Sequence, residues 1–417
     1  MSFTDALSSR TPRSLPGTGR NVLVLTYWSW NEALIQTYTL PYLRIMLKVL
    51  PPGSAIHLVT LEKGDFVPGA RIVEPGIVVH AFRYRPFGVR GMSMLAGLVW
   101  RSVQLVRRFK VDTVHAWCTP AGMIGYLVSM LTGRPLVIDS YEPHAEAMVE
   151  NGTWSRSGIA FRTLFLFERL QTRRARSVIA AVPGMRDYAL RTYGHVPDDF
   201  HVKPACVDLA QFGPDDIKRA ELVERYGLNG KLVVVYAGKF GGIYWDQEVF
   251  DLLRVARDHW GHRLHVLLLT GQPEDELVGY MAQAGLPRAL FTILSVPHAE
   301  VPVHMGLGDV ALTPVRPVPT KRYCTPIKDG EYWALGLPVV ITPGISDDSE
   351  IIRTHGIGSV IEGDTPEAYE RAIQEVDDLL KRFTRQELYD RIRPVAEKYR
   401  HFRVAESVYL KIYGKTG

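Results

Sequence analysis

Short apolar runs alternate along the chain with longer stretches in which apolar residues recur at helical spacing. The short runs predict strands and the longer stretches predict helices, because side chains repeat with different periods in the two structures. In the first half the predicted strands are 21–26, 56–60, 77–82, 113–116, 136–139 and 177–181, and the predicted helices are 92–109, 121–131 and 159–174. This alternation predicts a mainly parallel, doubly wound sheet.

The same alternation resumes after a changeover at 202–216. The second half predicts strands at 231–237, 264–270, 292–294 and 310–313, helices at 248–260, 274–285, 301–305 and 366–382, and a last helical segment at 385–413. A chain of 417 residues is too long for one simple core. The fold class predicted is therefore α/β, with two doubly wound parallel-sheet domains.

Composition adds limits on the class of protein. Hydrophobic residues make up 46% of the chain and charged residues 22%, a globular profile, and no apolar run is long enough to span a bilayer. Residues 1–20, rich in Ser, Thr, Arg and Pro, are expected to form a flexible tail rather than a signal peptide. The scattered cysteines, Cys118, Cys206 and Cys324, indicate neither disulfides nor a metal site, so a cytoplasmic location is expected.

The net charge of +5 does not indicate nucleic-acid binding. Basic residues nevertheless cluster at 101–110 and at 156–176, where the second cluster is interleaved with phenylalanines. Helices of this kind either lie peripherally on an anionic membrane or present a solvated face while their apolar stripe joins the core. Both interpretations stay open, and the first gains weight if an acceptor is a lipid.

The segment 325–342 carries the strongest functional signal. It predicts a loop, a short helix, a Gly336-Leu337-Pro338 turn and a buried strand. The loop brings backbone N–H groups, Lys328 and a helix start together, which favours an anionic ligand. Glu331 lies one turn into the helix, where a carboxylate can accept hydrogen bonds from a ribose diol. We therefore expect Thr325, Pro326, Ile327, Lys328 and Glu331 to bind a nucleotide.

A second motif, 236–244, follows the first strand of the second half. Gly238, Gly241 and Gly242 allow close approach of the backbone to a ligand and supply free N–H groups. Ligands bind at the carboxyl ends of strands in doubly wound sheets. The loop and Lys239 are accordingly candidates for a diphosphate site. A glycine-rich loop alone is weak evidence, but it lies in the same domain as the 325–342 segment.

Together these motifs resemble the donor-binding signature of glycosyltransferase family 4, the retaining enzymes with the GT-B fold. That family carries a pair of glutamates; Glu331 matches the second, and Tyr323 stands at the position of the first. Lys239 takes the place of the family's arginine, and the lysine that follows in the family is absent, with Ile243 near its position. The resemblance places the base-recognition loop at Val296 to His298, although His298 also suits an ordinary loop.

The resemblance also implies the domain organisation. We expect Rossmann-like domains facing a cleft, with an acceptor domain at 21–207, a nucleotide-sugar domain at 208–390 and a helix at 391–417 that returns to the first domain. His144, in the loop after the strand 136–139, matches a family histidine that faces the donor sugar. Asp139 and Glu142 are alternatives, and a structural role for His144 is equally open. The remaining acceptor-side candidates are Trp28, Trp30, His115 and Trp117.

The predicted function is transfer of a sugar from a nucleotide-diphosphate sugar to a hydroxyl of a glycan or lipid-linked glycan. His144, Lys328 and Glu331 are the predicted catalytic residues. No Asp-x-Asp motif occurs where the diphosphate is expected, so no metal and no cofactor are predicted. By resemblance the reaction retains the donor's configuration. Two alternatives remain: a nucleotide-sugar 2-epimerase, and a non-catalytic binding or assembly protein favoured by the missing glutamate and lysine.

Overall fold

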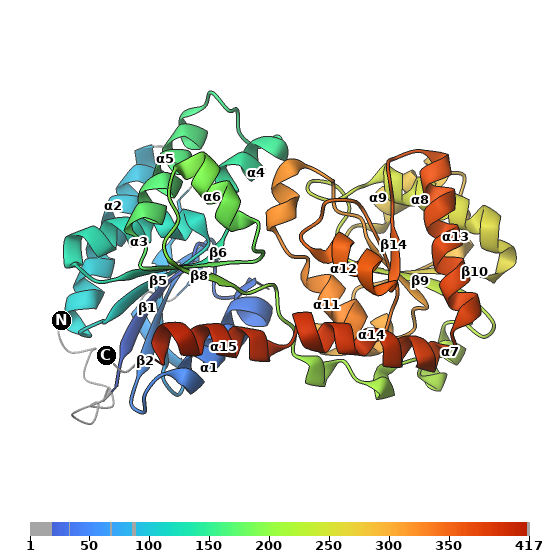
Figure 1. Ribbon diagram of the computed structural model, residues 1–417, viewed down its shortest axis with the longest axis horizontal. Coiled ribbons are helices and arrows are strands. Elements are labelled where there is room, and N and C mark those ends of the chain that lie inside the picture. Colours follow the sequence, from blue (N-terminus) through green and yellow to red (C-terminus); the bar gives the residue numbers. More distant parts are fainter. Residues whose placement is uncertain (1–18, 33, 67–68, 86–88, 415–417) are drawn as a thin grey trace.

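The computed structural model describes residues 19–32, 34–66, 69–85 and 89–414. Most of the predicted tail, 1–18, lies outside them. The described chain forms two α/β units side by side, each built on its own sheet (Figure 1).

The first sheet has the strand order β3-β4-β2-β1-β5-β6-β7-β8. All its pairs are parallel except the edge pair β3–β4. Its strands are β1 (Asn21–Leu25), β2 (Ala55–Glu62), β3 (Gly69–Glu74), β4 (Ile77–Arg83), β5 (Thr113–Trp117), β6 (Leu136–Tyr141), β7 (Ser177–Ala180) and β8 (Asp199–Val202). Helices cover both faces, so strands such as β1 are apolar on both sides rather than alternating.

The second sheet is parallel throughout, with the order β11-β10-β9-β12-β13-β14. Its strands are β9 (Leu232–Ala237), β10 (Leu264–Leu269), β11 (Phe291–Leu294), β12 (Val310–Thr313), β13 (Val339–Ile341) and β14 (Gly358–Val360). The chain order reverses between β9 and β12, which creates a switch point where the carboxyl ends of neighbouring strands diverge. Such points are where open α/β sheets bind ligands.

Helices pack on both sheets. In the first unit they are α1 (Leu40–Val49), α2 (Val89–Arg108), α3 (Thr119–Thr132), α4 (His144–Glu150), α5 (Ile159–Arg174) and α6 (Met185–Tyr193). In the second they are α7 (Ala220–Arg225), α8 (Gln247–Trp260), α9 (Glu274–Gln283), α10 (Val301–Met305), α11 (Ile327–Ala334), α12 (Asp348–His355), α13 (Pro366–Arg382) and α14 (Arg385–Tyr399). The final helix, α15 (Phe402–Tyr413), lies against α1 of the first unit (Figure 1).

The parallel α/β prediction is confirmed, and the differences are local. The segment 385–413 is two helices rather than one, because the backbone leaves helical geometry at Arg400, whose carbonyl accepts from the Val207 N–H at 2.7 Å. His401 then caps α15 by accepting from the Arg403 N–H at 2.9 Å. The sequence patterns also missed β3, β8 and several short helices. The break at Arg400 is what redirects the chain end from the second unit to the first.

A buried polar cluster fixes α15 to the first sheet. The Lys203 ammonium lies 3.1 Å from Asp139 Oδ1, and both side chains are almost completely buried. Tyr409 of α15 donates to Asp139 Oδ2 at 2.7 Å, and Tyr413 pairs with His115 at 2.6 Å. Burial by itself raises the pKa of Asp139, but the Lys203 charge, together with the contacts of His115 and Tyr409, outweighs it and holds the pKa well below its ordinary value.

We predict that Lys203→Met lowers the free energy of unfolding by about 3–5 kcal/mol, because it leaves Asp139 charged and unpaired in the core. Adding Asp139→Asn removes that charge and should recover part of the loss. Urea unfolding of the purified variants measures both effects. Lys48→Met, which breaks the exposed Lys48–Glu406 pair, is the matched control and should stay within about 1 kcal/mol of wild type. Equal losses in Lys203→Met and Lys48→Met would contradict the prediction.

Candidate functional site

The helix α11 presents the paired side chains of Lys328 and Glu331. It begins directly after Pro326, whose extended backbone cannot continue the helix toward the N-terminus. A spacing of three places the two side chains on one side of the helix. Lys328 Nζ lies 2.7 Å from Glu331 Oε2; the Lys328 side chain is 32% exposed and that of Glu331 only 4%. A partly accessible cation is therefore held over an almost buried carboxylate.

The glycine-rich loop lies beside α11, at the carboxyl end of β9. Tyr332 of α11 accepts a hydrogen bond from the Ala237 N–H at 2.9 Å, so helix and strand end are joined directly. Gly241 and Gly242 have φ values of 80° and 66°, the left-handed region that favours glycine. The Trp245 N–H donates to the carbonyl of residue 314 at 2.8 Å, which fixes the far end of the loop.

Other donor-side candidates occupy the same edge of the sheet. Val296 and His298 follow β11, and His298 is exposed at the start of a short 3-10 turn. Lys239 is exposed beside Gly238. Thr325 Oγ1 lies 3.2 Å from Ser346 Oγ, which joins the loop before α11 to the loop before α12. The predicted donor residues therefore share the carboxyl edge of the second sheet.

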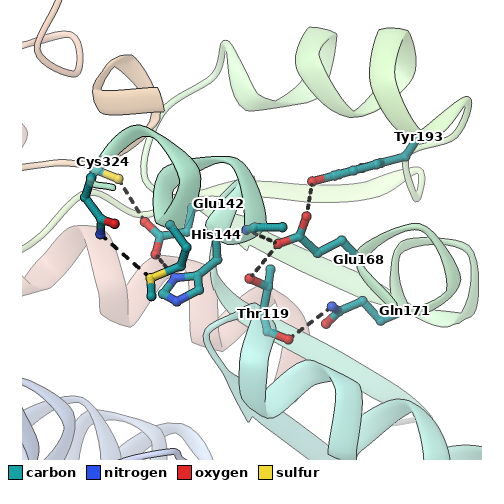
Figure 2. A network of polar contacts seen from close by, with 10 residues as sticks. Thr119, Glu142, His144, Glu168, Gln171, Tyr193 and Cys324 are labelled. Carbon is teal, nitrogen blue, oxygen red and sulfur yellow. Dashed lines mark hydrogen bonds and ion pairs between the residues drawn. The ribbon is translucent and has the colours of Figure 1, made fainter. Parts of the chain in front are cut away.

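His144 and Glu142 face this edge from the first unit. Glu142 lies in the connection from β6 to α4 and His144 is the first residue of α4, with His144 Nδ1 3.3 Å from Glu142 Oε1 (Figure 2). Burial opposes protonation of the imidazole, but Glu142 outweighs it and raises the pKa of His144 above its ordinary value. Burial likewise acts to raise the pKa of Glu142, and His144 outweighs it in the opposite direction. The pair thus favours imidazolium and carboxylate.

The two units touch at this point. Cys324 Sγ donates to Glu142 Oε2 at 2.9 Å (Figure 2). Glu150 accepts from the Thr320 N–H at 3.1 Å. The Tyr188 and Tyr323 rings pack with centroids 5.0 Å apart. The segment that leads into α11 is therefore bound to α4 and α6 of the other unit.

Glu168 is a buried support that the sequence analysis did not single out. It accepts hydrogen bonds from the Ala145 N–H at 2.9 Å and from Tyr193 at 3.0 Å, and so holds the first turn of α4 (Figure 2). Burial raises the pKa of Glu168 to about 7, against the effect of these hydrogen bonds. Its sequence signal is a single acidic residue among the phenylalanines and leucines of α5.

Two acceptor-side predictions are wrong as to position. His115 and Trp117 are completely buried, because alternate residues of β5 point to the face that α1 and α15 cover. They belong to the polar cluster around Lys203, whose ammonium lies 5.2 Å from the centre of the Trp117 ring. The hydrophobic pattern of β5 gave no sign that a distant C-terminal helix would close over this face.

Trp28 and Trp30 are half-buried after β1. The Trp30 N–H donates to Glu62 at 3.1 Å, and the Arg71 guanidinium lies 5.1 Å from the centre of a Trp30 ring. Trp28 packs into the core of the first unit.

Within the described residues, no group of three or more His, Cys, Asp or Glu side chains is arranged to hold a metal ion. No helix among them is long and apolar enough to cross a membrane.

Residues 50–206 match the family model described as a glycosyl transferase 4-like domain. The chain is 26% identical over 241 residues to alpha-D-kanosaminyltransferase of Streptomyces kanamyceticus, a match covering 55% of this chain and 61% of the relative. It is 31% identical over 195 residues to alpha-maltose-1-phosphate synthase of Mycolicibacterium smegmatis, covering 45% and 47% respectively. The chain therefore spans only about half to three-fifths of these relatives.

Solved structures resemble the whole chain. Sucrose-phosphate synthase of Thermosynechococcus elongatus has a TM-score of 0.73 at 14% identity, covering 95% of this chain and 98% of that one. Anabaena HepE in complex with UDP-glucose has a TM-score of 0.67 at 16% identity, covering 95% and 100%. WaaG, a glycosyltransferase involved in lipopolysaccharide biosynthesis, has 0.68 at 15%, with the same coverage. The chain thus has the GT-B fold of these proteins, and its residues 50–206 match the family model of a glycosyl transferase 4-like domain.

Proposed function

We propose that this protein transfers a sugar from a nucleotide-diphosphate sugar to an acceptor hydroxyl. The observation that carries the proposal is the position of Lys328, Glu331 and the glycine loop at one sheet edge, opposite the His144–Glu142 pair of the other unit. Cys324 joins the two sides through its contact with Glu142. The names of the relatives and the UDP-glucose complex of HepE support the same chemistry.

In this proposal the donor diphosphate lies against the glycine loop and the start of α11. Backbone N–H groups at a helix start and in a left-handed glycine loop favour an anion. Lys328 moves from Glu331 toward the diphosphate and stabilises the charge that develops on the leaving group. Glu331 is then released to accept hydrogen bonds from the ribose diol. The ion pair in the ligand-free protein keeps both side chains close to where they act.

His144 holds the donor sugar from the acceptor side. Its raised pKa favours a protonated imidazole, which donates hydrogen bonds well and is a weak base. We propose that the reaction retains the donor's anomeric configuration and needs no metal, since Lys328 and fixed N–H groups supply the positive charge. The acceptor is a glycan or lipid-linked glycan. NMR of the product's anomeric proton and turnover in the presence of a chelator address these two points.

We also propose peripheral contact with an anionic membrane, on the cytoplasmic side. The neighbouring helices α2, α3 and α5 contain one acidic residue, Glu168, and it is buried. Trp100 and Leu166 are nevertheless 60% and 51% exposed. Arg162 and Arg169 share the exposed side of α5 with Leu166, and Arg101, the residue after Trp100, is exposed as well. On an anionic bilayer, basic side chains are attracted to the negative headgroups and apolar side chains insert just below them. A helix surface that exposes both kinds and no carboxylate suits such binding.

Sugar transfer predicts that free nucleotide is released from one member of a panel of UDP-, GDP- and TDP-hexoses mainly when an acceptor glycan or glycolipid is added. Coupled nucleotide detection and mass spectrometry of the products measure this. Interconversion of the sugar without an acceptor would favour the epimerase. Tight binding without turnover under every condition would favour a non-catalytic protein.

Lys328→Met is expected to weaken nucleoside-diphosphate binding by about tenfold or more, because it removes the charge that meets the diphosphate. Calorimetry with the free nucleotide measures the change. Since the substitution leaves Glu331 unpaired, the double variant Lys328→Met with Glu331→Gln removes the buried-charge strain and should show at least the same loss, because Glu331 also binds the ribose. Lys231→Met, at the opposite end of β9, is the control. Unchanged affinity in the double variant would remove Lys328 from the site.

Reversing two charges on α5, with Arg162→Glu and Arg169→Glu, is expected to reduce partition onto phosphatidylglycerol-containing vesicles by about tenfold or more. Vesicle sedimentation measures binding, with pure phosphatidylcholine vesicles for comparison. The matched control reverses the exposed Arg371 and Arg382 on α13 and should retain binding. An equal loss in the control would show a net-charge effect, and no binding by wild type would exclude this contact.

A further inference from the structure

The donor-side motifs resemble glycosyltransferase family 4, and Tyr323 occupies the position at which that family has its first glutamate. Its side chain is 7% exposed and belongs to the hydrophobic core of the first unit. Its ring packs on Tyr188 of α6. The side chain at 323 therefore leaves the donor segment and enters the other unit. It supplies no carboxylate to the donor edge and acts as an apolar contact between the units.

A carboxylate reaches the same place from the other unit. Glu142 Oε2 accepts the hydrogen bond of Cys324, the residue directly after Tyr323, at 2.9 Å (Figure 2). Four residues further along, Lys328 begins the charged part of α11. Glu142 thus lies beside the stretch of backbone from which the missing glutamate would project.

The environment of Glu142 suits a ligand contact. Its side chain is 27% exposed and that of His144 is 30% exposed, whereas Glu168 behind them is completely buried. His144 keeps Glu142 in its charged form. The nearby carboxylates have other partners: Glu146 accepts from Tyr188 and Glu150 from Thr320, whereas Glu142 contacts His144 and the donor segment at Cys324. Among these groups Glu142 alone combines a charge, partial exposure and a place beside His144 and the donor segment.

We propose that Glu142 is a donor-sugar residue: its carboxylate accepts hydrogen bonds from hydroxyls of the bound sugar and replaces, from the first unit, the carboxylate that Tyr323 does not provide. This inference rests on the proposed function. It moves Glu142 from the acceptor side to the donor side. A carboxylate at this place selects a neutral or amino sugar and repels a hexuronate. It also makes recognition of the sugar depend on closure of the two units, while the second unit still holds the nucleotide.

The test compares free nucleoside diphosphate with its nucleotide sugar. Calorimetry on wild-type protein identifies which of UDP-, GDP- and TDP-hexoses binds more tightly than its free nucleotide, and hydrolysis of that donor gives a second readout. Glu142→Gln should reduce the affinity gained from the sugar by about tenfold or more, because hydrogen bonds to a charged acceptor are the strong ones. Its affinity for the free nucleotide should stay within about twofold of wild type.

Two variants separate sugar binding from a structural role. Cys324→Ala removes the contact between the units at Glu142 but leaves the carboxylate, so it should keep the sugar-dependent affinity. Glu150→Gln weakens the neighbouring contact with Thr320 and should also keep the sugar-dependent affinity. The corresponding nucleotide hexuronate should bind wild-type protein no better than the free nucleotide.

The outcomes are distinguishable. The proposal is supported if Glu142→Gln loses the sugar-dependent affinity but keeps its affinity for the free nucleotide, while Cys324→Ala and Glu150→Gln keep both. If Cys324→Ala loses as much as Glu142→Gln, the carboxylate only joins the units and the proposal is overturned. It is also overturned if Glu142→Gln keeps the sugar-dependent affinity, and the proposed function then still stands. If wild-type protein binds no nucleoside diphosphate at all, the proposed function fails and this inference fails with it.

Discussion

The buried ion pair between Asp139 and Lys203 is the interaction on which the rest of the arrangement depends. Asp139 sits at the end of β6, where Ser140 adopts a left-handed φ of 48° and the chain turns toward Glu142 and His144. The same carboxylate accepts from Tyr409 of α15. One side chain therefore fixes both the loop that faces the donor edge and the helix that returns from the second unit. Two buried charges are tolerated there because they are paired with each other, and Asp139 also accepts a hydrogen bond from Tyr409.

The candidate site is assembled from two separately built edges. The second unit offers cations and N–H groups at a switch point of its sheet, a geometry that suits a diphosphate whatever the attached sugar. The first unit offers a carboxylate–imidazolium pair on a short helix, supported from behind by Glu168. In the proposed function, binding of the diphosphate and recognition of the sugar therefore depend on different sheets. The contacts of Cys324 and Tyr323 bring them together.

Much of this could be predicted from local sequence. Periodic apolar patterns located the principal strands, and glycines at 241 and 242 with the 325–342 segment indicated where an anion would bind. These features depend on neighbouring residues, so their signals are local. Local sequence patterns could not predict the positions of four other residues in the fold: His115, Trp117, Glu168 and Cys324. Each is decided by a partner far away in the chain, such as Tyr413 for His115 or Glu142 for Cys324.

The sequence by itself determined the α/β alternation, the presence of two sheets and the residue types in the loops at the carboxyl edge of the second sheet, because side-chain period and turn chemistry act over a few residues. Only the tertiary structure decided which side chains face the cleft. Residues 115, 117 and 139 lie toward the carboxyl ends of β5 and β6, yet the break at Arg400 sends α15 over that face and buries them. The sequence shows that position 323 carries a tyrosine in place of a glutamate. Only the packing of the two units showed that Glu142 lies beside this position.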